Sequence, residues 1–362
     1  MNDRPHFFDL DPDSLAALFA EWGLPRFRTK QVMQWVYAKG VADPQAMTNL
    51  AQKDRDLLDD RLRFVTGYPV GHQLATDGTQ KLLLDWDAGR DEQGLPVLGG
   101  SASQTECVMI PSQRGRDRRT ACISSQIGCA VGCRFCASGL GGLDGNLSAG
   151  QIVEQVWQLG QLDNVGRITH VVFMGMGEPL ANFPEVARAA RTLMADWGLG
   201  ISGRRITIST VGLPAQIRRL ADLELPLTLA ISLHAPSDEL RRRLIPWAEK
   251  VSVDQLISAG KYYFDRTGRE VTLEYILLGG VNDQPEHARE LASVAKRLRS
   301  NVNLIRYNEV RGMPFSRPRT EDVRQFRQIL EAAGVNTHIR ASRGRDIAAA
   351  CGQLRHEQAA AS

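Results

Sequence analysis

Four of the chain's six cysteines lie within residues 122–136, in the segment CISSQIGCAVGCRFC. Cys129, Cys133 and Cys136 have the spacing CxxxCxxC, and the glycines beside them allow the loop to wrap around a common centre. Thiolates bind soft metal ions and iron–sulfur clusters, while Cys122 stands apart from the spacing. A chain of 362 residues can bury a large core without disulfide staples. The pattern therefore predicts metal or redox chemistry in a reducing compartment.

The number of nearby ligands indicates which centre the loop would hold. A structural zinc site normally has four ligands, and no further Cys or His follows until His170. A ferredoxin-type cluster also uses four cysteines. Three ligands leave one iron of a [4Fe–4S] cluster open to bind a substrate or cofactor. We therefore predict a [4Fe–4S] cluster at Cys129, Cys133 and Cys136, and a zinc-stabilised module is the alternative.

Glycines and short polar side chains recur at the predicted strand ends. In MGMGEPL (residues 174–180), Gly177 lets the backbone approach a ligand, and Glu178 can accept a hydrogen bond from an amino group. Four other polar side chains end or follow later strands: Ser209, Ser232, His234 and Asn308. Any one of them alone is more commonly a helix cap, but together they predict a polar rim for a ligand.

The elements that position these residues alternate between strand and helix. Strands are predicted at 120–125, 168–174, 204–210, 226–232, 270–277, 301–305 and 336–340. Helices are predicted at 184–196, 213–222, 237–264, 284–299 and 320–333. About six βα units of this kind predict an α/β fold with a parallel sheet, as an open or partial barrel. The active site of such a sheet lies at the carboxyl ends of its strands.

The remaining chain divides into three regions. Residues 1–70 read as a small helical domain, with amphipathic patterns in DPDSLAALFAEW and RTKQVMQWVYAKG. Residues 71–120 read as an antiparallel β connector, with strands at KLLLDW and TECVMI. Residues 121–355 form the α/β part, and 356–362 are expected to be a disordered tail.

Charge and hydropathy limit the kinds of partner that the protein is expected to bind. Lys and Arg number 44 against 41 Asp and Glu, so the net charge of +3 does not by itself predict nucleic-acid binding. Arginines cluster at 114–119, 204–205, 218–219, 241–243 and 311–319. Any one of these clusters alone is interpreted as a solvent-exposed helix face. Guanidinium groups also bind phosphate oxygens well, so phosphate binding is the alternative. No apolar run approaches the roughly 20 residues of a membrane span, and no secretory signal begins the chain, so we expect a cytoplasmic protein.

The cysteine spacing at the end of the first strand, with Phe135 inside it, resembles the radical S-adenosylmethionine superfamily, and GMGEP resembles that superfamily's GGEP element. The resemblance implies that Cys129, Cys133 and Cys136 hold a [4Fe–4S] cluster whose open iron binds S-adenosylmethionine. One electron, from a donor such as flavodoxin or ferredoxin, would then yield a 5′-deoxyadenosyl radical. The implied binding residues are Gly177, Glu178, Ser209, Ser232, Leu233, His234 and Asn308.

Further segments narrow the resemblance. Besides the cysteine segment, VVFMGMGEPLAN, RRITISTVG, AISLHAP, VNLIRYN and RGRDIAAACGQL are similar to the RlmN/Cfr family of radical S-adenosylmethionine RNA methyltransferases. The similarity runs from about residue 20 to 355. It implies methylation of an adenine of 23S rRNA, at carbon 2 in the RlmN type, which also acts on tRNA, or at carbon 8 in the Cfr type. We expect the carbon 2 reaction, with carbon 8 as the alternative.

The resemblance also implies roles for cysteines outside the triad. One S-adenosylmethionine would methylate Cys351, and a second would generate the radical that activates this methyl group, so two are used per turnover. Cys122 would then form a transient disulfide with Cys351 as the product leaves. Glu106, in TECVMIP, matches the proton acceptor. Cys107 matches no role and is interpreted as a core residue.

One segment departs from the family pattern. Where the family has basic residues before Asn-Leu, this chain has Asp144-Gly145 before Asn146. The departure weakens the expected RNA contact at this loop, whereas the arginines at 114–119 and 311–319 and the basic and aromatic residues of 1–70 can replace it. An iron–sulfur protein that binds RNA without methylating it is a second class of function. The oligomeric state is left open.

Overall fold

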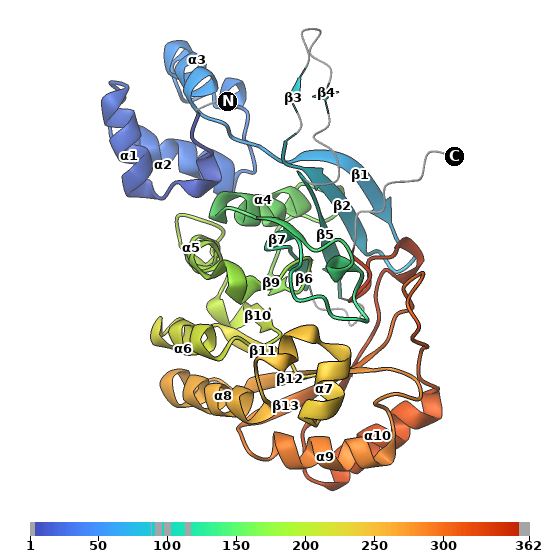
Figure 1. Cartoon of the computed structure of the whole chain (residues 1–362). Coiled ribbons are helices and arrows are strands. Elements are labelled where there is room, and N and C mark those ends of the chain that lie inside the picture. Colours follow the sequence, from blue (N-terminus) through green and yellow to red (C-terminus); the bar gives the residue numbers. More distant parts are fainter. Residues whose placement is uncertain (1–3, 88, 91–95, 98–102, 113–116, 355–362) are drawn as a thin grey trace.

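The computed structural model describes residues 4–87, 89–90, 96–97, 103–112 and 117–354, and its centre is one curved sheet (Figure 1). The strand order is β1-β2-β5-β6-β9-β10-β11-β12-β13-β14. Strands from β6 to β14 pair in parallel, and β1, β2 and β5 extend the sheet in antiparallel fashion. The parallel strands are β6 (Arg119–Cys122), β9 (His170–Phe173), β10 (Ile206–Thr210), β11 (Thr228–Ser232), β12 (Val271–Leu277), β13 (Ser300–Arg306) and β14 (Thr337–Arg340).

Helices fill the six connections between these seven strands (Figure 1). They are α4 (Ala149–Gly160), α5 (Phe183–Met194), α6 (Pro214–Asp222), α7 (Asp238–Leu244), α8 (Val253–Thr267), α9 (Pro285–Ala295) and α10 (Thr320–Ala332). The predicted α/β class, a partial barrel of six βα units with a helical N-terminal region, is confirmed. Helix α4 had not been predicted, although Ser148 and Gln151 form a capping box at its start.

The sequence pattern explains the parallel sheet. All seven residues of β12, VTLEYIL, are buried, as expected of a strand covered on both faces. Helices such as α5 bury one apolar face, which includes Phe183, Val186 and Leu193. These residues join a single hydrophobic core that also contains Phe7 and Val32 from the N-terminal region. The helical region is therefore packed on the barrel rather than tethered to it.

The N-terminal third has the helical and antiparallel parts that were predicted. The helices are α1 (Pro12–Glu21), α2 (Phe27–Met33), a π-helix at Gln34–Ala38, and α3 (Gln52–Arg61). The strands are β1 (Tyr68–Leu74), β2 (Gln80–Asp85), β3 (Gly89–Arg90), β4 (Pro96–Val97) and β5 (Gln104–Pro111). No helix of the described residues is long and apolar enough to cross a membrane. The predicted tail at 356–362 and part of the arginine cluster 114–119 lie outside the described residues.

Short elements complete the chain. Strands β7 (Gln126–Gly128) and β8 (Leu143–Asn146) form a small antiparallel hairpin around the cysteine loop. Single 3-10 turns lie at Phe7–Asp9, Pro44–Ala46, Ala137–Gly139, Pro179–Asn182, Gly203–Arg205, Pro246–Glu249 and Arg345–Ile347. Asp144 is exposed on β8, so the departure from the family pattern lies at the surface beside the cysteine loop.

A buried carboxylate joins the helical region to the barrel. Glu154 of α4 lies 2.9 Å from Nε2 of His6 and accepts hydrogen bonds from the N–H groups of Thr66 and Gly67 at 3.0 and 2.8 Å. Burial by itself would lower the pKa of His6, but the carboxylates of Asp9 and Glu154 raise it above its usual 6.5. Burial would also raise the pKa of Glu154, but His6 and the backbone donors lower it below 4.5.

We predict that Glu154→Ala lowers the free energy of unfolding by about 3–5 kcal/mol, because the substitution leaves buried His6 and two backbone donors without their acceptor. Urea unfolding followed by circular dichroism measures the loss. Glu331→Ala, which removes an exposed ion pair with Arg327, is the control and should cost less than about 1 kcal/mol. An equal effect of the two substitutions would contradict the assignment.

The same pair makes a pH prediction. The ion pair contributes fully between pH 4.5 and 6.5. Its contribution is lost as the pH rises through the raised folded-state pKa of His6, and also as the pH falls through the lowered folded-state pKa of Glu154. The difference in stability between the native chain and Glu154→Ala should therefore be largest within that window and shrink on both sides.

Candidate active site

The cysteine loop begins where β6 ends and is closed by the β7–β8 hairpin. Gly128 has φ +74°, and a Cβ at this position would collide with the carbonyl of Gly142. The next residue, Cys129, donates its N–H to the same carbonyl at 2.6 Å. Only glycine permits this close crossing of the two strands, which fixes the start of the loop.

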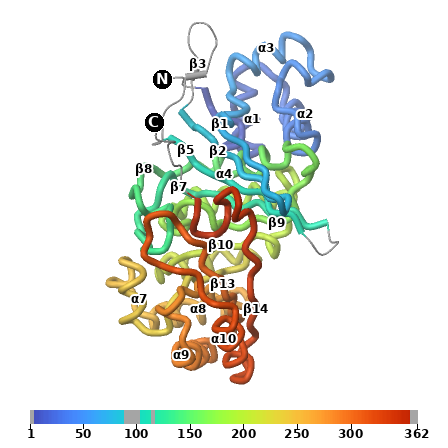
Figure 2. Tube along the Cα trace, turned by 90° about the vertical axis from the view of Figure 1, so that its right-hand side faces the viewer, coloured from blue at the N-terminus to red at the C-terminus, as the bar shows by residue number. Residues whose placement is uncertain are grey.

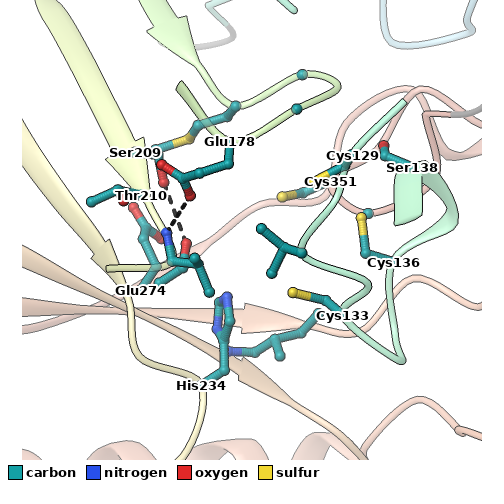
Figure 3. A pocket seen from close by; sticks show the side chains of 18 of the residues that line it. Cys129, Cys133, Cys136, Ser138, Glu178, Ser209, Thr210, His234, Glu274 and Cys351 are labelled. Atoms are coloured by element: carbon teal, nitrogen blue, oxygen red, sulfur yellow. Dashed lines mark hydrogen bonds between the residues drawn. The ribbon is translucent and has the colours of Figure 1, made fainter. Parts of the chain in front are cut away.

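The three thiols of the loop line one pocket at the carboxyl ends of the parallel strands (Figure 3). Cys129, Cys133 and Cys136 share the pocket with Glu178, His234 and other predicted residues, and its empty space, including the part open to solvent, is about 890 Å³. Such a space suits a cofactor. Within the described residues, no three His, Cys, Asp or Glu side chains meet at a point that could hold a single metal ion. The three cysteines line a shared space, which has room for a group larger than one ion.

Burial opposes ionisation of these thiols. It raises the pKa of Cys129 to about 11 and raises the pKa of Cys133 and of Cys136, and for Cys133 the neighbouring thiols add to the effect. Positive charge among them, such as that of iron ions, would stabilise the thiolates. The donor set therefore fits an iron–sulfur cluster.

Glu178 is buried at the edge of the pocket. Its Oε2 accepts the N–H of Val211 at 2.7 Å, and its Oε1 accepts the N–H of Leu180 at 2.9 Å. Burial raises its pKa to about 7, although these hydrogen bonds oppose the rise. Gly177 before it has φ +99°, and a Cβ there would collide with the side chain of Gln126. The segment is therefore a backbone turn built to sit against the cysteine loop.

His234 is held in one tautomer. Its Nδ1 accepts the N–H of Ile276 at 3.1 Å, so in the neutral ring the proton is on Nε2. Burial, together with the charge of Arg241, lowers its pKa to about 3, so the ring is neutral. The ring packs edge-on against Phe135 of the cysteine loop, with centroids 5.1 Å apart. His234 therefore presents an N–H donor beside the cluster loop.

The other predicted binding residues do not all line the pocket of the three cysteines. Ser209 and Ser232 line the pocket with their hydroxyl oxygens 3.4 Å apart. Leu233 is fully buried, and its N–H and carbonyl are both used within the protein. Asn308 does not line this pocket but lines a second cavity, where its amide donates to the carbonyl of Cys351 at 3.4 Å.

The second cavity brings Cys122 and Cys351 together. It has about 1380 Å³ of empty space, counting the part open to solvent, and Cys351 and Arg340 line both this cavity and the first pocket. Burial raises the pKa of Cys122 to about 12, with the neighbouring Cys351 adding to the rise and Arg340 opposing it. Residues about 230 positions apart in the sequence therefore share one cavity wall.

Glu106 occupies β5 and lines neither cavity. Its Oε1 pairs with Nζ of Lys81 at 2.7 Å, and both side chains are buried. The same ammonium lies 3.5 Å from the carbonyl of Ala348, in the segment that carries Cys351. Cys107 is fully buried in the hydrophobic core, which confirms its interpretation as a core residue.

Sequence reasoning missed two buried charged residues near the pocket. Arg241 is fully buried and donates to the carbonyls of Leu233 and Val211, which follow β11 and β10, at 3.2 and 2.5 Å. Glu274 accepts from Arg340 at 3.5 Å, and its second oxygen, Oε2, has no hydrogen-bond partner among the described residues. An acidic residue within the otherwise apolar run VTLEYIL was the one signal available for Glu274.

The fold is a partial barrel of parallel strands, and one pocket is surrounded by three cysteines, a glycine–glutamate turn and polar strand ends. This combination defines the radical S-adenosylmethionine class. Residues 123–292 match the radical SAM superfamily, and residues 6–63 match the ribosomal RNA large subunit methyltransferase N-terminal domain. The chain is 42% identical to the probable dual-specificity RNA methyltransferase RlmN of Rhodopirellula baltica, over 98% of this chain and 92% of that protein.

Two further comparisons agree. The dual-specificity RNA methyltransferase RlmN of Dichelobacter nodosus is 39% identical, over 98% of this chain and 95% of that protein. The crystal structure of a radical SAM methyltransferase from Sphaerobacter thermophilus superposes with a TM-score of 0.88 at 41% identity, covering 97% of this chain and 99% of that one. The chain belongs to the RlmN family of radical S-adenosylmethionine RNA methyltransferases, a family that implies an iron–sulfur cluster and S-adenosylmethionine.

We predict that Arg241→Met lowers the free energy of unfolding by about 3–5 kcal/mol, because it removes a buried cation and leaves the carbonyls of Leu233 and Val211 unsatisfied. Arg242→Met is the matched control, since Arg242 is half-exposed and pairs with Glu249 only at 4.0 Å. It should cost less than about 1 kcal/mol. Chemical unfolding of both variants checks the difference, and equal stabilities would refute the role given to Arg241.

Proposed function

We propose that the protein methylates carbon 2 of an adenine in 23S rRNA, and of tRNA, through a methylated Cys351. The observation that carries the proposal is the position of Cys351, whose residue lines both the pocket of the cluster cysteines and the cavity that contains Cys122. The proposed route requires this position, because the thiol of Cys351 must contact a cofactor in one step and an RNA base in the next. The name of the RlmN relatives supports RNA as the substrate.

The first pocket is proposed to hold both cofactors. Cys129, Cys133 and Cys136 would hold a [4Fe–4S] cluster, leaving one iron open. When bound, cluster and S-adenosylmethionine supply the methyl group and the one-electron chemistry, with two S-adenosylmethionine molecules per turnover and an external donor such as flavodoxin or ferredoxin. The proposed contacts of S-adenosylmethionine are Gly177, Glu178, Ser209, Ser232, His234 and the carbonyl oxygen of Leu233, which has a second lone pair besides the one that accepts from Arg241. Asn308, from the second cavity, is proposed to orient the Cys351 segment towards it.

The cysteines carry the covalent steps. Cys351 Sγ would lose its proton and bond to the methyl carbon as that carbon's bond to the sulfonium sulfur of the first S-adenosylmethionine breaks, so that S-adenosylhomocysteine leaves. The methyl group would then give one hydrogen atom to the 5′-deoxyadenosyl radical derived from the second molecule, and its carbon would bond to the adenine, which gives up one electron to the cluster and its ring proton to a base. Cys122 as thiolate would then attack Cys351 Sγ. The S–S bond forms as the S–C bond breaks, and the bonding pair passes to the carbon on the base, which takes a proton to become methyl. A thiol reductant then restores both cysteines.

Glu106 is proposed to accept the proton that leaves the adenine. Its ion pair with Lys81 favours the ionised form that a base requires. Because Glu106 lines neither cavity, the proton can reach it only if the nearby segment around Ala348 shifts. Lys81 contacts both groups, so it links the carboxylate to that segment.

We predict that Cys351→Ala abolishes methyl transfer to RNA while RNA affinity stays within about threefold, because the substitution removes the methyl acceptor and little of the surface. Incorporation of labelled methyl groups and filter binding measure the two quantities. Cys107→Ala is the control, since Cys107 is a buried core residue, and it should retain turnover. Methyl transfer by Cys351→Ala would rule out the methyl-cysteine route, and an RNA-binding protein without this activity would show no transfer in either variant.

Nucleoside analysis tests the position of the methyl group. Mass spectrometry of 23S rRNA and tRNA from cells lacking this protein should show loss of 2-methyladenosine, which returns on complementation. Loss of 8-methyladenosine instead would assign the carbon 8 reaction. Retention of 2-methyladenosine in rRNA would overturn the proposed substrate. Loss from rRNA alone would remove tRNA from the proposal.

A further inference from the structure

The second cavity has a charge pattern of its own. Arg118, Arg340 and Arg343 all line it, and none of its described lining residues is acidic. The first pocket, in contrast, is lined by Glu178 and Glu274. The acidic side chains therefore line only the first pocket, and two of the three arginines line only the second cavity. Arg340, like Cys351, lines both.

The three arginines differ in whether a nearby carboxylate balances their positive charge. Arg340 is half-buried and pairs with Glu274 at 3.5 Å, and Arg343 pairs with Asp77 at 3.8 Å. Arg118 is exposed, its Nε donates to the Thr120 hydroxyl at 3.2 Å, and it makes no ion pair with a described residue.

The rest of the cavity is suited to a neutral, flat ligand. Apolar side chains make up much of its wall: Ile110, Val172, Met174, Ile305, Ile339 and Leu354. An extruded base is typically held between such side chains, with its phosphate held by cationic groups outside. The two thiols that must act on the base lie in the same wall.

We propose that Arg118, in the wall of the cavity that contains Cys122 and Cys351, binds a phosphate that flanks the target nucleotide of the RNA. This inference rests on the proposed function, since it assumes an RNA substrate. The exposed guanidinium of Arg118 is placed where a nucleic-acid backbone can reach it, and the balanced Arg340 stays inside beside the thiols. Arg118 is thus a substrate-binding residue.

The test compares Arg118→Ala with Arg118→Lys and with Arg289→Ala, which removes an exposed arginine from α9. Unmodified 23S rRNA made by transcription is the substrate. Arg118→Ala should raise the KM for RNA roughly 10-fold and lower the salt slope of RNA binding by about one, with the Kd for S-adenosylmethionine unchanged. Arg118→Lys should recover most of the affinity, and Arg289→Ala should match the native chain.

Other outcomes decide against the cavity. If Arg118→Ala leaves the KM for RNA unchanged, the proposal is wrong. A raised Kd for S-adenosylmethionine with unchanged RNA binding would assign the cavity to the cofactor and also overturn it. If the native chain transfers no methyl group to RNA, the proposed function fails by itself. Filter binding of the same RNA to both variants then still decides whether Arg118 contacts it, because binding does not require turnover.

Discussion

The catalytic arrangement depends on hydrogen bonds between two loops that lie about 215 residues apart in the sequence. The N–H of Ala137, next to Cys136, donates to the carbonyl of Gly352 at 2.8 Å, and the hydroxyl of Ser138 donates to the carbonyl of Leu354 at 2.6 Å. Ser138 is buried, so its hydroxyl would be costly to leave unpaired. These contacts hold Cys351 against the cysteine loop.

The other end of the same segment is held by the antiparallel connector. Oδ2 of Asp346 accepts the N–H of Thr76 at 2.9 Å, and Oδ2 of Asp77 accepts the N–H of Gly344 at 3.2 Å. Figure 2 shows the C-terminal segment lying beside the β1 and β2 strands. Of these residues Thr76 and Asp346 are exposed and Asp77 is half-buried, so the segment can shift at lower cost than the barrel strands. A segment that can shift against a fixed barrel suits the proposed role of Cys351, which would contact S-adenosylmethionine in one step and RNA in the next.

The sequence predicted the barrel well because each signal was local. Strands such as β12 are apolar at most positions, and CxxxCxxC places three thiols within eight residues. The β7–β8 hairpin was missed because its stability comes from a backbone crossing at Gly128 rather than from apolar alternation. Arg241 was read as part of a solvated cluster, since the carbonyls that it binds belong to other strands. The role of Cys351 came from family resemblance, because nothing local in AACGQL distinguishes it from a core cysteine.

The distribution of charge explains how one cysteine can face two different ligands. S-adenosylmethionine carries a sulfonium and an amino group, so a pocket containing Glu178 and the unpartnered Oε2 of Glu274 favours it electrostatically. RNA carries phosphates, which the arginine-lined cavity favours instead. Glu274, which lines the first pocket, pairs at 3.5 Å with Arg340, which lines both spaces. Cys351 lines both spaces, which is the position that the proposed function requires of it.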